Sequence, residues 1–412
     1  MLDVVMAAFA VLLLFVSHSW ARGATPAKAS PRQNSAPTFS FISERSALRI
    51  PIELNGNLIL IQARVNGSVT LNFILDTGSE ISIISNGRAQ SLGLKRAKNP
   101  ISATGAPEET ELSGVSFELP GLQIKNAVTL ALPLDSFEPR LGKRIDGVIG
   151  GNFLKGVVAE IDYTKRTLSF HNSRTFHYAG TGQVIPISID KNSPIVDARI
   201  IQSGFAPIDA KFLLDTGFSS AISFDRDFVE SHRFLVPAKT VRSSGATLDG
   251  DTHELVGRLT QLQVGRFLMW NALAKFTFSQ DEPADSGLAG TIGGEFLRRF
   301  NVILDYGKAK LILQPNSHFA DPDDTGMTGM AIVAVGRDFR EFLVGSILPM
   351  SAASESGLHI GDVLITIDGK PTSNFTMEQL RQMFRINGRS YWIEVTREKR
   401  KLRVRLTLRR II

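Results

Sequence analysis

The chain contains no cysteine among its 412 residues. It can therefore form no disulfide bond, and it has no thiol nucleophile and no thiolate ligand for a metal ion. Its stability must come from packing, and the folded protein should tolerate an oxidising or a reducing compartment equally well.

Several motifs for catalysis and binding are missing too. The sequence has no His-Glu-x-x-His pair for zinc, no Gly-x-Ser-x-Gly elbow for a serine nucleophile and no glycine-rich loop for phosphate. The nearest imitation of a serine elbow, residues 217–221, has no identifiable base. The seven histidines are scattered along the chain. We therefore expect neither a metal nor a cofactor.

The N-terminus predicts an exported protein. A run of 13 apolar residues, 4–16, precedes the small residues Ser19 and Ala21, which is typical of a secretory signal over residues 1–21. Asp3 departs from this pattern, since a basic residue usually stands there. The run is shorter than the roughly 20 residues that cross a bilayer, so we expect no stable membrane span. Residues 22–45 are predicted to be a flexible linker, and the expected localisation is periplasmic or extracellular.

The net charge of +6 is concentrated near the C-terminus, which raises the question of nucleic-acid binding. However, Leu402, Val404, Leu406 and Leu408 alternate with polar residues, which is the period of a half-buried strand. Two strands joined by a turn at 398–400 account for the basic residues as an outward face. We therefore expect no nucleic-acid partner.

One acidic motif occurs twice. Asp76-Thr77-Gly78 and Asp215-Thr216-Gly217 each end an apolar run, and they are followed by Val148-Ile149-Gly150 and Thr291-Ile292-Gly293. The two acids lie 139 positions apart (215 − 76), and the later glycines lie 143 apart (293 − 150). Such constant spacing indicates duplicated domains. Short strands and turns fill both halves, including a hairpin turn at residues 66–67, so we expect a mainly β protein with two homologous lobes over 46–175 and 180–316.

Two buried acids at matching positions predict a shared site. If the lobes face each other, Asp76 and Asp215 meet, and the pair shares one proton because two adjacent negative charges repel. Such a pair can activate a water molecule, and which acid plays which role stays open here. Thr77 and Thr216 could hydrogen-bond across the lobes, while the glycines Gly78 and Gly217 let backbone amides approach the carboxylates.

These motifs resemble those of aspartic peptidases over residues 50–314. The likeness is greatest to bacterial retropepsin-like proteins with two fused lobes and a C-terminal PDZ domain. It implies that Asp76 and Asp215 are the catalytic pair, and that a polypeptide substrate lies between the lobes under a flap. The candidate flap glycines are Gly105 and Gly245.

The chain departs from the family pattern at two places. Ser79 can bond the first aspartate, whereas Phe218 holds the equivalent place in the second copy, where Ser219 is the candidate substitute. Pepsin-like enzymes also carry a flap tyrosine, and no tyrosine or tryptophan lies between residues 79 and 146.

Residues 326–412 resemble a PDZ domain of the bacterial protease-associated type, with a helix expected over 377–384 and Thr376 as its cap. Such domains bind protein C-termini, and the expected carboxylate loop comprises Met327, Thr328, Gly329 and Met330. A PDZ unit that packs on the lobes and binds nothing is the alternative.

Three functional hypotheses follow. The first is an exported aspartic endopeptidase that works through one intramolecular pair of acids. The second is a non-catalytic peptide-binding or scaffold protein that retains the acid-protease fold. In the third, each lobe pairs with its twin in another chain.

Overall fold

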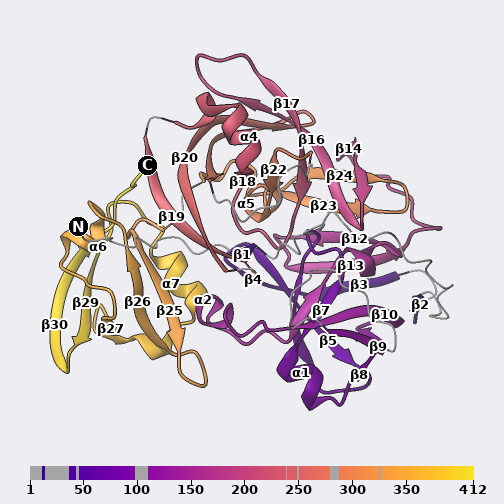
Figure 1. Cartoon of the computed structure of the whole chain (residues 1–412), viewed down its shortest axis with the longest axis horizontal. Helices are drawn as coiled ribbons and strands as arrows, with labels where there is room; N and C mark the ends of the chain where they lie inside the picture. The colour runs from indigo at the N-terminus through magenta and orange to yellow at the C-terminus, as the bar shows by residue number, and fades with distance from the viewer. Residues whose placement is uncertain are drawn as a thin grey trace, which may run out of the picture.

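The computed structural model describes residues 12–13, 37–42, 46–97, 110–237, 239–247, 250–278, 287–323 and 326–412. The protein is mainly β, with two barrel-like lobes and a smaller C-terminal domain beside them (Figure 1). The expected fold class is therefore confirmed.

The first lobe is a closed ring of strands. Its pairing runs β5–β6–β11–β7–β10–β9, and β9 also pairs with β5. The turn between β5 and β6 lies at residues 66–67, where both residues have positive φ, as the Asn-Gly pair predicts. The ring strands are β5 (Leu58–Val65), β6 (Leu71–Leu75), β7 (Ser82–Ser85), β9 (Thr110–Leu119), β10 (Leu122–Leu132) and β11 (Gly147–Ile149), with β2 (Thr38–Phe41), β4 (Glu53–Asn55) and β8 (Lys95–Arg96) paired at their edges.

The second lobe repeats this ring in the same order. Its pairing runs β16–β17–β22–β18–β21–β20 and returns to β16, so every ring strand of one lobe has a counterpart in the other. This agreement confirms the duplication that the spacing of the motifs predicts. The ring strands are β16 (Ser193–Ile201), β17 (Ile208–Leu214), β18 (Ile222–Phe224), β20 (Gly250–Val264), β21 (Phe267–Thr277) and β22 (Gly290–Ile292), and β1 (Leu12–Leu13), β15 (Ser188–Asp190) and β19 (Thr240–Thr247) pair beside them.

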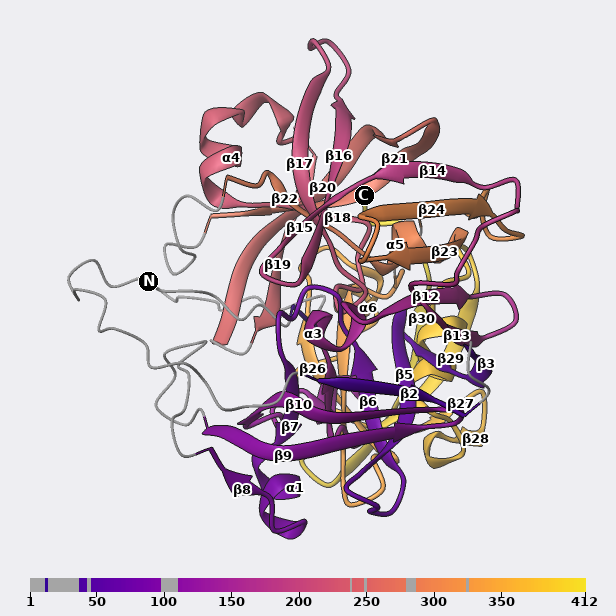
Figure 2. The same cartoon turned by 90° about the vertical axis from the view of Figure 1, so that its right-hand side faces the viewer.

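A third sheet joins the lobes. Its central pair is antiparallel, with β12 of the first lobe against β23 of the second and Glu160 opposite Ile303. The outer strands match in pairs on either side of this centre (Figure 2). A continuous apolar core runs through both lobes. The strands are β3 (Ser46–Pro51), β12 (Val157–Asp162), β13 (Thr167–Asn172), β14 (Gln183–Pro186), β23 (Phe300–Asp305) and β24 (Lys310–Pro315).

The helices of the lobes are short. Two of them, α3 and α5, directly follow β11 and β22 at glycine pairs, and their first residues bond the loops that follow the two acidic motifs. The helical segments are α1 (Asn86–Ser91), α2 (Glu138–Leu141), α3 (Gly151–Leu154), α4 (Arg226–Ser231), η1 (Arg233–Leu235) and α5 (Gly294–Leu297).

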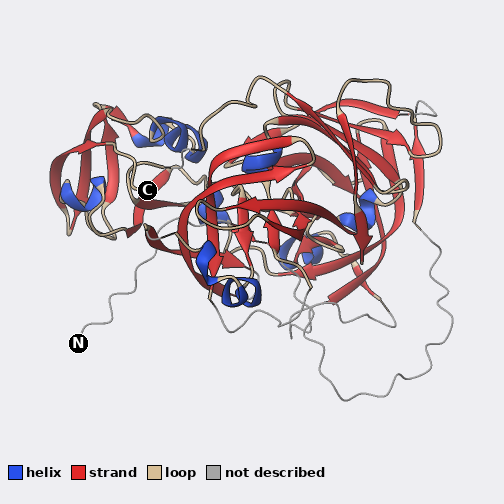
Figure 3. Ribbon diagram, turned by 90° about the horizontal axis from the view of Figure 1, so that it is seen from above, coloured by secondary structure: helices blue, strands red, loops and turns tan. Residues whose placement is uncertain are grey.

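The C-terminal domain has its own core and sheet, and it sits to one side of the lobes (Figure 3). Strand β25 is at the edge of the sheet, and α7 is capped by Thr376, as the sequence predicts. The elements are β25 (Met330–Val335), β26 (Glu341–Ile347), α6 (Ala352–Glu355), β27 (Val363–Ile367), β28 (Lys370–Pro371), η2 (Thr372–Asn374), α7 (Met377–Met383), β29 (Ser390–Arg397) and β30 (Arg400–Thr407). Within the described part of the chain, no helix has the length and apolar character needed to cross a membrane.

Candidate active site

The two acids occupy equivalent positions at the ends of β6 and β17. The N–H of Asp76 donates to Ile149 O at 3.0 Å, and the N–H of Asp215 donates to Ile292 O at 2.9 Å. Strands β11 and β22 thus hold the two turns from the side. Both acids are shielded from solvent, with exposed fractions of 0% and 1%.

The lobes bring the two carboxyl groups together. The N–H of Gly78 crosses to Asp215 Oδ1 at 3.1 Å, and the N–H of Gly217 reaches the same oxygen at 2.6 Å. A Cβ on Gly78 would lie 2.6 Å from Asp215 Cγ, and one on Gly217 would collide with Asp76 Cγ. Each glycine is therefore required because the acid of the other lobe lies against it.

The surroundings of the two acids differ. Burial raises the pKa of Asp76 well above its usual value, and the charge of Asp215 raises it further. Burial also raises the pKa of Asp215, but hydrogen bonds from Asp76 and from nearby backbone amides oppose this rise. The direction of these effects favours the proton on Asp76 and the negative charge on Asp215.

The two threonines tie the lobes together. Thr77 Oγ1 donates to Leu214 O at 2.6 Å, and Thr216 Oγ1 donates to Leu75 O at 2.7 Å. Each hydroxyl also accepts the backbone N–H of the other threonine, at 3.0 and 3.1 Å. All four bonds are buried, so they hold the two acidic turns at a constant separation.

The residues after the two motifs work through their backbones. The N–H of Ser79 donates to Asp76 Oδ1 at 2.9 Å, whereas its hydroxyl donates to Ile81 O at 2.8 Å. The backbone amide of Phe218 lowers the pKa of Asp215 in the same way. Neither acid therefore depends on the side chain at this position, because the backbone supplies the donor in both lobes. Ser219 instead accepts a bond through its carbonyl from Asn57.

Two asparagines that the sequence reasoning missed brace the site. Asn57 of the first lobe donates to Ser219 O at 2.9 Å, and Asn192 of the second lobe donates to Glu80 O at 3.1 Å. A Cβ on Gly294 would lie 2.7 Å from Asn57 O, and one on Gly151 would collide with Asn192 O. In each lobe, the hairpin turn that carries the asparagine therefore packs against the loop after the acidic motif of the other lobe. The available signal was an asparagine in a tight turn at a similar distance before each Asp-Thr-Gly.

Burial also affects a tyrosine close to the acids. The pKa of Tyr306 is raised well above its usual value by burial and by the charges of Asp76 and Asp215. Its ring belongs to the core that spans both lobes, so it remains a neutral neighbour of the pair. Among the described residues, no group of three or more histidine or acidic side chains is placed to hold a metal.

The structure places only one of the two candidate flap glycines. Gly105 lies outside the described residues. Gly245 lies in β19, opposite Thr252 of β20, so it belongs to a long hairpin of the second lobe.

The predicted carboxylate loop of the C-terminal domain offers fewer backbone donors than its four residues suggest. The N–H of Met327 donates to Phe384 O, and the N–H of Met330 donates to Thr328 Oγ1, both at 3.0 Å. These two donors are therefore already used. Within the described chain, the N–H groups of Thr328 and Gly329 have no such partner, so they are the donors available to a ligand.

Comparison with protein families agrees with this geometry. Residues 61–153 match a family model described as aspartyl protease, and residues 321–390 match one described as PDZ domain. The chain carries a retropepsin-like aspartyl protease domain and a PDZ domain. The aspartyl protease match covers most of the strand ring of the first lobe, and the second lobe repeats the strand order of that ring. A search of curated proteins finds no match to the chain.

Proposed function

We propose that the protein is an aspartic endopeptidase that hydrolyses polypeptides between Asp76 and Asp215, with the PDZ domain as a peptide-binding module. The observation that carries this proposal is the pair of buried carboxyl groups, one from each lobe, each lying against the glycine of the other's motif. Burying two acids is costly, and a shared proton makes such a pair useful for proton transfer.

The reaction follows from the unequal pKa values. Ionised Asp215 removes a proton from a water molecule, and the water oxygen attacks the carbonyl carbon of the peptide bond. Protonated Asp76 donates a hydrogen bond, and then its proton, to the carbonyl oxygen. When the tetrahedral intermediate collapses, the C–N bond breaks, Asp215 passes its proton to the leaving nitrogen, and Asp76 regains a proton from the hydroxyl.

Two features support this assignment of roles. Asp76 has the more strongly raised pKa, so it is protonated over a wider range of pH. Asp215 receives the N–H groups of Gly78 and Gly217 on one oxygen, which stabilises its negative charge.

The test replaces each acid singly. Asp76→Asn and Asp215→Asn should each reduce cleavage of a denatured protein substrate by at least about a thousandfold, because each variant removes one half of the proton relay. Circular dichroism should show that the variants remain folded. If each variant keeps about half the activity, pairing between chains replaces this proposal.

The non-catalytic alternative is tested with the same preparation. If the parent protein cleaves no denatured substrate between pH 3 and 8 but still binds peptides, the protein is a peptide-binding scaffold with a protease fold.

We also propose that the protein is exported. The proposal rests on the apolar run at residues 4–16 and the small residues Ser19 and Ala21. Expression in a bacterial host followed by N-terminal sequencing of the periplasmic fraction tests it. A mature N-terminus just after Ala21 is expected, and recovery of the intact chain in the cytoplasm would contradict it.

A further inference from the structure

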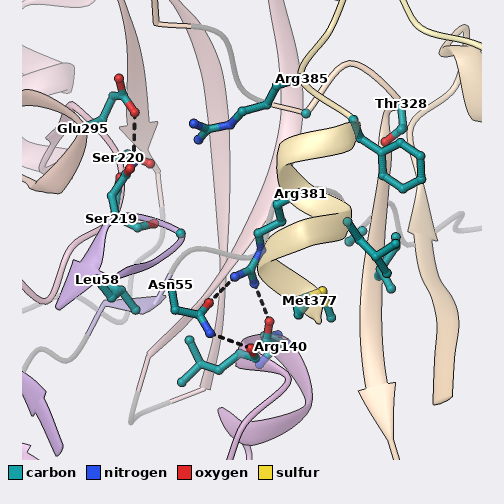
Figure 4. A pocket seen from close by; sticks show the side chains of 18 of the residues that line it. Asn55, Leu58, Arg140, Ser219, Ser220, Glu295, Thr328, Met377, Arg381 and Arg385 are labelled. Atoms are coloured by element: carbon teal, nitrogen blue, oxygen red, sulfur yellow. Dashed lines mark hydrogen bonds between the residues drawn. The ribbon is translucent and has the colours of Figure 1, made fainter. Parts of the chain in front are cut away.

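The peptide groove of the PDZ domain lies between strand β25 and helix α7. Because β25 is the edge strand of its sheet, its outer backbone groups can receive an added strand. In this protein the groove faces the protease lobes instead of open solvent (Figure 4). A cavity of about 190 Å³ remains at the junction.

One half of the groove is filled by the first lobe. Helix α2 lies along β25, and α2, β25 and α7 are neighbours in space (Figure 1). The residue after α2, Gly142, fits between the two walls of the groove. A Cβ on it would lie 2.6 Å from Met377 Cβ on α7 and 3.5 Å from Ala334 Cβ on β25. An extended peptide of four or more residues cannot occupy this half at the same time.

Polar contacts hold the first lobe in place. Arg381 of α7 donates to Asn55 Oδ1 and to the backbone oxygen of Arg140 (Figure 4). Glu378 of the same helix accepts the N–H of Gly56 at 2.8 Å. Asn55 in turn donates to Leu141 O at 2.9 Å. The carbonyl groups at the end of α2 are thus bound by side chains from both domains.

The cavity lies in the other half of the groove. It is lined by Thr328, which precedes Gly329 in the chain, and its apolar lining includes Met330, Leu380 and Phe384. Arg385 points across this space toward Ser220 of the second lobe (Figure 4). Backbone donors, an apolar floor and a cation fit a chain end with an apolar last residue and a free carboxylate.

We propose that helix α2 of the first lobe and an extended peptide C-terminus compete for the PDZ groove, so that binding of the peptide displaces the PDZ domain from the first lobe. The peptide-binding part of this proposal rests on the function proposed above for the PDZ domain, whereas the competition rests on the contacts of α2, Asn55 and Gly142. Helix α2 acts as an intramolecular competitor, and a peptide must displace it to fill the PDZ groove.

Competition lowers the apparent affinity for the peptide. Only the fraction of molecules with a displaced lobe can bind a full-length ligand, and the apparent dissociation constant rises as that fraction falls. Weakening the lobe's contacts without altering the groove should therefore tighten peptide binding. Asn55 and Gly142 allow this, because both belong to the first lobe.

The test measures peptide binding to the full chain in an Asp76→Asn background, which prevents cleavage of the probe. The probe is a fluorescein-labelled Gly-Gly-Asp-Glu-Val-Leu peptide with a free C-terminal carboxylate, and its C-terminal amide is the comparison. Asn55→Ala and Gly142→Ala should each bind the free-carboxylate peptide about tenfold more tightly than the parent, or about 1.4 kcal/mol. Asn66→Ala is the matched control, since Asn66 also bonds the backbone from a turn of the same lobe, to Gly114 O.

A second measurement follows the domains directly. Because the chain has no cysteine, donor and acceptor dyes can be attached at Gln62→Cys and Lys401→Cys, both at exposed positions. The peptide should reduce energy transfer in the parent. Equal affinities for the parent and both variants, binding without a change in energy transfer, or no binding of the probe by any of them would each overturn the competition. None of these outcomes bears on hydrolysis by the acid pair, which is tested separately.

Discussion

The hydrogen bonds between the two lobes at Thr77 can be removed with little change of shape. Valine has almost the volume of threonine but no hydroxyl, so Thr77→Val leaves the carbonyl of Leu214 and the N–H of Thr216 buried without partners. Each unsatisfied buried group costs about 1 to 3 kcal/mol, so the two together should cost the lobes about 2 to 6 kcal/mol of stability. The acids also lose the contact that holds their separation, and we expect peptidase activity to fall at least about a hundredfold.

The assay compares urea midpoints and kcat for matched variants. Thr77→Ser keeps the hydroxyl and should retain most of both properties. Thr129→Val removes a buried threonine hydroxyl that bonds only within its own lobe, to Ala127 O at 3.0 Å. It should lose stability but keep the activity. The reasoning is refuted if Thr77→Val matches Thr77→Ser, or if Thr129→Val lowers the activity as much as Thr77→Val does.

Two further predictions follow from the same geometry. Gly217→Ala places a Cβ against the carboxyl of Asp76 and should abolish hydrolysis, whereas Gly87→Ala, where a Cβ meets only open space, should be silent in a kcat/KM measurement. Burial raises the pKa of Asp323 to about 7, so the folded state favours the protonated acid. Stability from this group is complete below about pH 4 and is lost as the pH rises through 7. Asp323→Asn should remove that loss, and thermal melting between pH 4 and 9 checks it; an unchanged pH profile would contradict the assignment.

The hairpin turn and the helix cap could be predicted because each depends on residues that are close together in the sequence. An Asn-Gly pair between apolar runs predicts the turn at residues 66–67. Thr376 and Gln379, three positions later, bond each other's backbone N–H and so cap the N-terminus of α7. The duplicated motif indicated two similar lobes because spacing is preserved when a domain is copied. From these features the sequence predicts the fold class and the two acids.

The contacts that complete the site were not readable, because they join distant segments. Asn57 bonds a carbonyl 162 positions away, and nothing local to Asn57 distinguishes it from other turn asparagines. The bond from Ser79 to Asp76 uses the backbone N–H and not the hydroxyl, and a residue type does not show which of the two serves the acid. The contact between α2 and the PDZ groove depends on the fit of two folded surfaces. The periodicity of apolar residues along the chain does not predict such a contact.

The fusion of two lobes into one chain has a chemical consequence for the pair of acids. In a dimer of identical lobes the two acids have identical sequences around them, so neither is favoured as the proton carrier. Here Asp215 Oδ1 receives two backbone amides, whereas Asp76 Oδ1 receives one, from Ser79. The buried carboxyl group with fewer donors is the less stable of the two in its ionised form. Divergence of the duplicated halves can thus make the two acids unequal before a substrate binds, in the direction that the proposed acid and base roles require.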